Sequence, residues 1–136
     1  MRINTKIRYG LRMLVCLALA KGIFNTVKLG KEIDVSPKYL RKLAGPLEKA
    51  GLIKSIQGVH GGYLIDQDPA DIKLKMIFEA FDEDTTLSRC FVIEKCSLFD
   101  ECLVRPLWTY LESKLDREFV NISIEDILTK KFNKKK

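Results

Sequence analysis

Residues 36–66 read SPKYLRKLAGPLEKAGLIKSIQGVHGGYLID, and this stretch decides the fold. It opens with Ser36 and Pro37, a hydroxyl N-cap followed by proline at the first helical position, where a missing N–H costs nothing. The next apolar residues recur in steps of three and four and predict one buried helix face: Leu40, Leu43, Leu47 and Ala50. Gly51 is placed to end the helix just beyond its C-cap. Pro46 predicts a kink, because proline removes a backbone hydrogen bond and clashes with the preceding turn.

A β-hairpin is predicted directly after this helix. Leu52, Ile53 and Ile56 indicate its first strand, and residues 63–65 indicate its second. The turn between the strands, QGVHGG at 57–62, has glycines where a positive φ is needed. A basic helix that runs into a glycine-tipped hairpin is typical of the recognition helix and wing of a winged helix-turn-helix. We therefore expect a mostly α-helical fold with a small β-hairpin.

The charge of this unit points to double-stranded DNA as a partner. The exposed helix face carries Lys38, Arg41, Lys42 and Lys49, and the hairpin tip carries Gln57, Gly58 and His60. In a winged helix-turn-helix the helix enters the major groove and the hairpin tip touches the flanking backbone or the minor groove. Residues 1–66 hold 12 Lys or Arg against 4 Asp or Glu, whereas residues 67–129 hold 7 against 14. The alternative is an unrelated α+β protein whose lysines only solvate its surface.

Two helices are predicted before this stretch. Asn4 or Thr5 can cap the first helix, which extends to about Lys21. Its apolar stripe consists of Ile7, Leu11, Leu14, Val15, Ala18 and Leu19. Cys16 lies among apolar neighbours in this helix, so we expect a free thiol packed in the core. Thr26 begins the second helix and completes the helix-turn-helix. The inward residues of that helix are expected to be Val27, Leu29 and Ile33.

Three helices are predicted after the hairpin. The first begins at Pro69, and its apolar positions are Ile72, Leu74, Ile77, Phe78 and Phe81. The second begins at Pro106 and places one set of residues on one side: Leu107, Trp108, Leu111, Leu115 and Phe119. A small domain cannot cover so wide a stripe, so we expect homodimerisation through the helix at about 106–120; the alternative is packing within one subunit. Ser123 and Asp126 form a capping-box-like start for a last helix.

Cys90, Cys96 and Cys102 are each separated by five residues, in a segment without helical or strand periodicity. Disulfides are rare in the cytosol, so a disulfide framework is disfavoured. Three thiolates in an irregular loop suit a soft metal or an iron–sulfur cluster. Structural zinc is the first competitor, although it prefers four closed ligands and a shorter spacing. A thiol switch is the second, because Arg89 and Lys95 can activate a neighbouring thiol. Three unconnected cysteines are the third.

The helix with its hairpin and the cysteine segment together resemble the Rrf2 family of bacterial transcription regulators, which includes IscR-like and NsrR-like iron–sulfur sensors. The resemblance covers nearly the whole chain. The matching positions are Met1 to Ile3, Tyr39, Leu40, Leu43, Leu47, Ala50 to Leu52, Ser55, Gly58, Gly61 to Tyr63, the three cysteines, and Leu107 with Trp108. The resemblance implies a homodimer that binds a DNA operator and carries a 2Fe–2S or 4Fe–4S cluster on Cys90, Cys96 and Cys102. The even cysteine spacing is more similar to the IscR-type loop.

The family pattern also implies which residues meet DNA. At the start of the recognition helix these are Ser36, Lys38, Tyr39 and Arg41. Arg41 can pair with O6 and N7 of guanine, whereas Lys38 would neutralise a phosphate. Gln57 stands where the family usually has an arginine that probes the minor groove, which implies weaker or differently specific readout by the wing.

The fourth cluster ligand does not carry over from the family. IscR-like proteins place a histidine three residues after the last cysteine, where this chain has Arg105. Some NsrR-like proteins use an acidic residue near the N-terminus, where this chain has Arg8. Glu94, Asp100 and Glu101 stay open as candidates.

The sequence thus predicts a dimeric transcription regulator, a repressor, that senses cluster status, redox stress or nitric oxide through its cysteine loop. The alternative is a cluster-free regulator of the same fold that responds to thiol oxidation or a small metabolite. We expect a DNA-binding domain at 1–66, a sensor and dimerisation region at 67–129, and a basic, disordered tail at 130–136. No paired acid and base, nucleophile motif or phosphate loop indicates an enzyme. The longest apolar run, 13–20, is too short to span a bilayer, so we expect a cytoplasmic protein.

Overall fold

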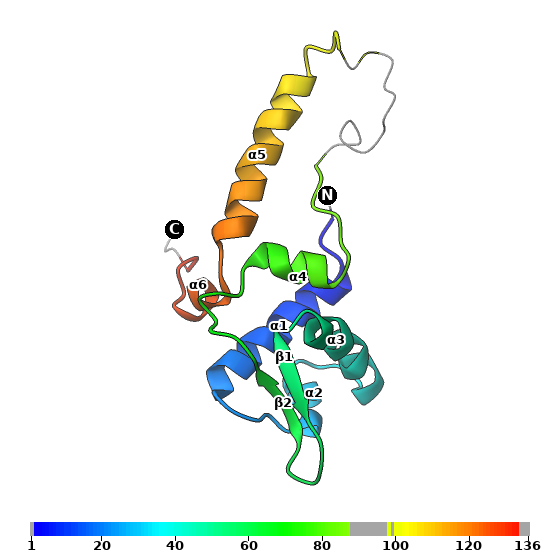
Figure 1. Ribbon diagram of the computed structural model, residues 1–136, viewed down its shortest axis with the longest axis vertical. Coiled ribbons are helices and arrows are strands. Elements are labelled where there is room, and N and C mark those ends of the chain that lie inside the picture. Colours follow the sequence, from blue (N-terminus) through cyan, green and yellow to red (C-terminus); the bar gives the residue numbers. More distant parts are fainter. Residues whose placement is uncertain (1, 88–97, 99, 134–136) are drawn as a thin grey trace.

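The computed structural model describes residues 2–87, 98 and 100–133, and it shows a mostly helical chain with one two-stranded sheet. The helices and strands in chain order are α1 (Thr5–Ala20), α2 (Thr26–Glu32), α3 (Pro37–Lys49), β1 (Ile53–Ile56), β2 (Gly62–Ile65), α4 (Leu74–Ala80), α5 (Arg105–Asn121) and α6 (Ile124–Leu128). In Figure 1 the winged unit forms one end of the molecule, and α5 rises away from it so that its first turn lies farthest from the hairpin. The predicted fold class is confirmed.

The first helix begins and ends where local signals predict. The side chain of Asn4 caps α1 by accepting a 2.9 Å hydrogen bond from the N–H of Ile7, and Lys21 ends the helix with φ 53°. The residues of α1 that enter the core are Ile7, Met13, Leu14, Leu17 and Ala18. The prediction for Leu19 is wrong, since its side chain is 65% exposed. Leu19 lies in the last turn, where Leu17 and Ala18 already occupy the inward face.

The second helix differs from the prediction at one residue. Asn25 caps α2 by accepting hydrogen bonds from the N–H groups of Val27 and Lys28. Leu29 and Ile33 are buried as predicted, but Val27 is 60% exposed. Residues two apart on a helix point to different sides, so Val27 cannot share the inward face of Leu29.

The recognition helix ends in a Schellman motif. Beyond the C-cap, Gly51 takes φ +77°, its N–H donates to the carbonyl of Glu48 (2.9 Å), and the N–H of Leu52 donates to Leu47 (3.0 Å). Ser36 caps the helix as predicted, and Leu40, Leu43 and Leu47 are fully buried. The prediction that Ala50 shares their buried face is wrong, because Ala50 is the exposed C-cap residue. The helix continues through Pro46 to Lys49, and the kink stays a prediction.

The hairpin gains a third backbone partner from the turn between α1 and α2. Its own strands pair from Ile53 opposite Ile65 to Ile56 opposite Gly62. Phe24 and Tyr63 exchange two backbone hydrogen bonds, of 2.7 and 3.0 Å. A Cβ atom on Gly62 would lie 2.0 Å from the Phe24 carbonyl oxygen, so only glycine permits this close approach.

The prediction of a helix beginning at Pro69 is wrong, because α4 begins only at Leu74. The preceding residues pair with the junction of α5 and α6 instead. The N–H of Leu74 donates to the carbonyl of Ile122 (2.8 Å), and the N–H of Ile124 donates to the carbonyl of Ile72 (3.0 Å). Backbone that forms these strand-like bonds is not available for a helix. The helix then ends at Phe81, followed by Asp82 with φ 55°.

The second half of α5 packs on α4, whereas its first half extends outward (Figure 1). The ring centroids of Phe119 and Phe78 lie 5.1 Å apart. Nζ of Lys75 forms an ion pair with Oδ1 of Asp116 at 2.7 Å. Towards the other end, Leu107 is 50% and Tyr110 58% exposed.

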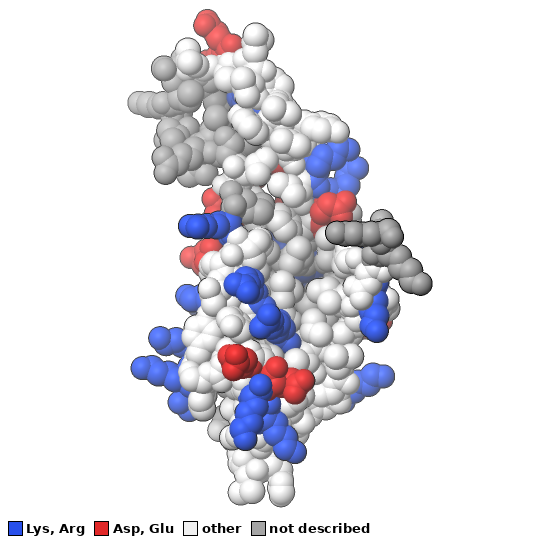
Figure 2. Space-filling model, turned by 180° about the vertical axis from the view of Figure 1, so that it is seen from behind, with Lys and Arg blue, Asp and Glu red and all other residues white. Residues whose placement is uncertain are grey.

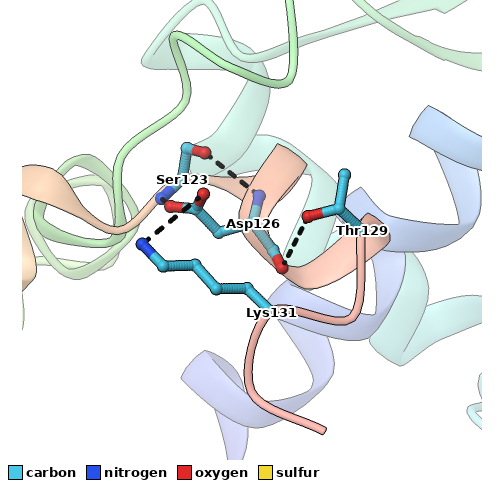
Figure 3. Close-up of polar contacts among 4 residues, drawn as sticks. All are labelled: Ser123, Asp126, Thr129 and Lys131. Carbon is cyan, nitrogen blue, oxygen red and sulfur yellow. Dashed lines mark hydrogen bonds and ion pairs between the residues drawn. The ribbon is translucent and has the colours of Figure 1, made fainter.

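The last helix, α6, turns back to pack against α1. Figure 3 shows the predicted capping box of α6, in which Ser123 accepts from the N–H of Asp126 and Asp126 accepts from the N–H of Ser123. The predicted tail, 130–136, is described as far as residue 133, where it forms turns. Within the described ranges, no helix is long and apolar enough to cross a membrane.

Candidate nucleic-acid interface

Arg41 of α3 and the tip of the hairpin line one open hollow of about 370 Å³. Gln57 and Gly58 form part of its wall, and the start of α2 forms another part. Electrostatics also place Arg41 near the hairpin. Burial raises the pKa of Tyr63 in β2, the carboxylate of Glu48 raises it further, and the guanidinium of Arg41 lowers it. The second turn of α3 and the wing therefore present one continuous surface to a ligand.

Contacts at both ends of α3 fix it relative to the rest of the winged unit. Near its C-terminus, the hydroxyl of Ser55 in β1 donates a 3.0 Å hydrogen bond to Glu48. Near its N-terminus, the ring of Tyr39 meets the ring of Tyr9 from α1. The recognition helix and the hairpin are thereby held together before any partner binds.

The structure brings together only some of the predicted DNA-contacting residues. Arg41, Gln57 and Gly58 line the hollow. The others lie outside it: Ser36, Lys38, Tyr39, Lys42 and His60. The hydroxyl of Ser36 accepts a 3.1 Å hydrogen bond from the N–H of Tyr39, so part of its capacity is used in the cap. Lys38, Lys42 and His60 are exposed, and their contacts with DNA stay predictions.

Three residues at the start of α2 join this surface without having been predicted. Asn25, Thr26 and Val27 line the hollow together with Arg41. The signal available in the sequence was the N-cap pair Asn25–Thr26, which marks a helix start but does not reveal what lies beside it. Val27 is exposed because it lies two residues before the buried Leu29 and therefore on a different side of α2.

The charge asymmetry is visible on the surface. Figure 2 shows most of its Lys and Arg side chains around the lower half of the molecule, which holds the winged unit, with one group of acidic side chains among them and further acidic side chains at mid-height and at the top. The excess of basic over acidic side chains around the winged unit favours binding of a polyanion there.

Two of the three predicted cluster ligands, Cys90 and Cys96, lie outside the described residues. Cys102 is half-buried and precedes Arg105, the first residue of α5. Within 2–87, 98 and 100–133, no group of three or more His, Cys, Asp or Glu side chains could hold a metal ion. Three thiols fit the donor chemistry of an iron–sulfur cluster. The guanidinium of Arg105 carries only N–H donors and no acceptor lone pair for a metal, so Arg105 does not supply the fourth ligand.

The chain that enters the cysteine segment is anchored to two helices. The N–H of Leu87 donates a 2.6 Å hydrogen bond to the carboxylate of Glu112 on α5. The side-chain amide of Asn4, the N-cap of α1, donates to the carboxylate of Glu83. These two bonds connect the segment to the projecting helix and to the first helix of the winged unit.

The fourth cysteine is confirmed as a packing residue. Cys16 is half-buried and packs against the hydrophobic core. Burial raises the pKa of its thiol, and the nearby carboxylate of Glu32 raises it further. A thiol with a raised pKa carries little thiolate at neutral pH, which lowers its reactivity.

Comparison with known proteins places the whole chain among bacterial regulators. Residues 3–130 match the sequence model of the Rrf2 family, described as an iron-dependent transcriptional regulator. The chain is 30% identical over 133 residues to the HTH-type transcriptional regulator IscR of Pectobacterium atrosepticum, covering 96% of this chain and 81% of the relative.

Two solved structures resemble the whole fold. CymR, the global cysteine regulator of B. subtilis, superposes with a TM-score of 0.79 at 27% identity, covering 95% of this chain and 97% of CymR. The IscR structure from T. potens gives a TM-score of 0.74 at 24% identity, covering 100% of this chain and 93% of the other, and supports the fold alone.

Proposed function

Since the chain belongs to the Rrf2 family of transcriptional regulators, we propose that it is a homodimeric repressor that senses iron–sulfur cluster status, redox stress or nitric oxide. Its relatives are DNA-binding regulators and not enzymes. The observation that carries the DNA-binding part of this proposal is the hollow shared by Arg41 and the hairpin tip, which supports Arg41, Gln57 and Gly58 as DNA-facing residues. Arg41 reads a base edge there, while Lys38 and Lys42 contact phosphates.

The proposed dimer forms through α5. This helix has 17 residues and is about 25 Å long. Its second half is occupied by α4, but Leu107 and Tyr110 in its first half are exposed, as is Val104 just before the helix. A second copy of α5 would cover these apolar side chains. Two recognition helices would then be available for two half-sites of an operator. The division at residue 66 into a DNA-binding domain and a sensor and dimerisation region is part of this proposal.

Cys90, Cys96 and Cys102 are the residues proposed to hold the cluster. A bound cluster supplies iron that reacts with oxidants and nitric oxide. The residues of this chain provide the connection to DNA binding. Leu87 is hydrogen-bonded to Glu112 on α5, and Glu83 is hydrogen-bonded to the Asn4 cap of α1. A rearrangement of the cysteine segment would therefore shift both the dimerisation helix and the winged unit, and with them the spacing of the two wings.

A cluster-free regulator that responds to thiol oxidation or a small metabolite is the second candidate. Two observations favour it. Arg105 occupies the position where IscR-like proteins have a histidine ligand, and the fold matches CymR, described as a cysteine regulator, over nearly its full length.

Spectroscopy of protein purified without oxygen tests the cluster. We expect charge-transfer absorption with matching iron and sulfide contents, lost in Cys90→Ala, Cys96→Ala and Cys102→Ala. Cys16→Ala is the matched control and should keep the absorption, because Cys16 packs in the core. A colourless, iron-free protein that cannot be reconstituted would overturn cluster binding. Selection of duplexes from a random pool tests DNA binding separately, and failure to enrich any sequence would overturn the regulator assignment for the surface around Arg41.

A further inference from the structure

A second open cavity, of about 540 Å³, lies where the last turn of α1, strand β2 and helix α6 meet. It shares no lining residue with the hollow beside Arg41. Its walls are mainly aliphatic and include Ala18, Leu19, Leu64, Ile65 and Leu128. Cavities that hold small molecules typically measure about 300–1,000 Å³ and combine apolar walls with a few polar groups.

Two opposite charges line this cavity. Lys21 is the C-cap residue of α1, and Glu125 lies in the first turn of α6. Among the residues that the structure describes, no ion pair or side-chain hydrogen bond occupies either charge. The cavity therefore offers a cation, an anion and an aliphatic surface, all still available for a ligand.

We propose that this cavity binds an α-amino acid with an aliphatic side chain. The carboxylate of the amino acid would pair with Lys21 and its ammonium group with Glu125. The side chain would lie against Leu64 and Leu128. A simple carboxylate or a simple amine would satisfy only one of the two protein charges, so the lining favours a zwitterion. A long polar side chain would lose its hydration against the aliphatic walls.

The position of the cavity links it to regulation, and this step rests on the proposed function. One wall is β2, the second strand of the wing, in which Ile65 pairs with Ile53. Another wall is α6, which follows α5 directly. The N–H of Glu125 in α6 donates a 3.2 Å hydrogen bond to the carbonyl of Pro69. An amino acid between them would fix the wing relative to the dimerisation helix. If the amino acid binds one spacing of the two wings of the dimer more tightly than another, it favours that spacing.

Isothermal titration calorimetry on the full chain without DNA tests the site. The probes are L-leucine, L-isoleucine, L-valine and L-methionine, with 4-methylpentanoate and 3-methylbutylamine as analogues that each lack one charge. We expect at least one amino acid to saturate one site per chain. Lys21→Gln, Glu125→Gln and each analogue should weaken binding by about tenfold or more, since each removes one charged hydrogen bond.

Lys49→Gln and Glu79→Gln are the matched controls, because both residues are exposed and neither lines the cavity. They should bind as the unaltered protein does, and thermal melts verify that all four variants fold. No saturable binding of any of the four amino acids at millimolar concentration would overturn the proposal, as would binding that neither Lys21→Gln nor Glu125→Gln weakens. Because the titration contains no DNA, a protein that binds the amino acid but enriches no duplex would overturn the proposed function and leave this site standing.

Discussion

The ring of Tyr9 in α1 meets the ring of Tyr39 in α3 edge to face, with the centroids 6.0 Å apart and the planes at 84°. The guanidinium of Arg12 lies 5.2 Å from the centroid of the same Tyr9 ring. Tyr39 is in the first turn of α3, so a helix outside the helix-turn-helix holds the start of the helix that we propose to read DNA.

Replacing Tyr9 with alanine should weaken both folding and operator binding. An edge-to-face ring pair contributes about 0.5–1.5 kcal/mol beyond its buried area, so we expect a total loss of about 1–3 kcal/mol in the free energy of unfolding. Operator affinity should fall several-fold because Tyr39 loses its support. Tyr9→Phe keeps the ring and should change neither quantity by more than about 0.5 kcal/mol. Urea denaturation and fluorescence anisotropy measure the two effects. Full operator affinity in folded Tyr9→Ala would refute the supporting role.

Arg41→Ala should alter sequence preference. If Arg41 pairs with a guanine in the major groove, its loss should cost about 1–3 kcal/mol at one base pair and leave the preference elsewhere intact. Binding titrations against single-base operator variants measure this. Lys49→Ala, at the exposed end of α3, is the control and should change no base preference. Equal weakening by Arg41→Ala on every sequence would show that Arg41 contacts phosphate only.

Gly62→Ala should be among the most destabilising single substitutions in the hairpin. Its Cβ would lie 2.0 Å from the carbonyl oxygen of Phe24, so the Phe24–Tyr63 pairing would have to open. Loss of two backbone hydrogen bonds together with strain predicts a loss of roughly 2–4 kcal/mol in the free energy of unfolding. At Gly22 the nearest atom to an added Cβ is 4.0 Å away. Gly22→Ala is therefore the control and should keep or slightly raise stability. Equal unfolding midpoints for the two variants would contradict the close approach.

Ser123→Ala should destabilise the return of α6 onto α1. The hydroxyl of Ser123 accepts a 3.2 Å hydrogen bond from the N–H of Asp126, and the residue is only 5% exposed. Loss of such an N-cap costs about 0.5–2 kcal/mol. Urea denaturation measures the loss. Ser113→Ala is the matched control, because Ser113 is exposed within α5 and its hydroxyl donates to the carbonyl of Tyr110 in the same helix. A Ser123→Ala protein as stable as Ser113→Ala would contradict the role of the cap.

Asp126→Asn should reduce stability in a pH-dependent way. The hydrogen bond from the N–H of Ser123 lowers the pKa of Asp126, and the ammonium group of Lys131, whose nitrogen lies 3.9 Å from Oδ1 of Asp126, acts in the same direction. Figure 3 shows both side chains. The unfolded chain therefore binds this proton at higher pH than the folded chain. The stabilisation is present at neutral pH and is lost as the pH falls through the lowered pKa. Denaturation at a series of pH values should show the wild type converging on the variant in acid. A gap that stays constant with pH would contradict this assignment.

Much of the fold could be predicted because its boundaries depend on local chemistry. Asn4, Ser36 and Ser123 cap helices through their own side chains, and Gly51 ends α3 through its positive φ. The start of α4 could not be predicted in this way. The backbone near Ile72 pairs with the α5–α6 junction, some fifty residues later in the chain, and nothing in the local sequence reveals that partner.

The same division applies to the site. Arg41 and the hairpin tip could be predicted, because a basic helix followed by a glycine turn is a local pattern. The contribution of Asn25 to the same hollow could not, because it depends on how α2 lies against the hairpin. Tyr9 escaped prediction for the same reason, since its contact with Tyr39 exists only in the folded chain. For Cys90 and Cys96, which lie outside the described residues, the spacing stays the only argument.

The pairing of the first and last helices bears on how the protein is made in the cell. Helix α6 packs against α1, and Phe119 packs against Phe78, so residues made later complete a core begun by residues made earlier. During synthesis, the faces of α1 and α4 that α6 and α5 cover stay exposed until α5 and α6 have been made. A polypeptide that stops before α5 would present these faces to chaperones and proteases. Truncated chains should therefore be degraded before they can compete with the full chain for operators.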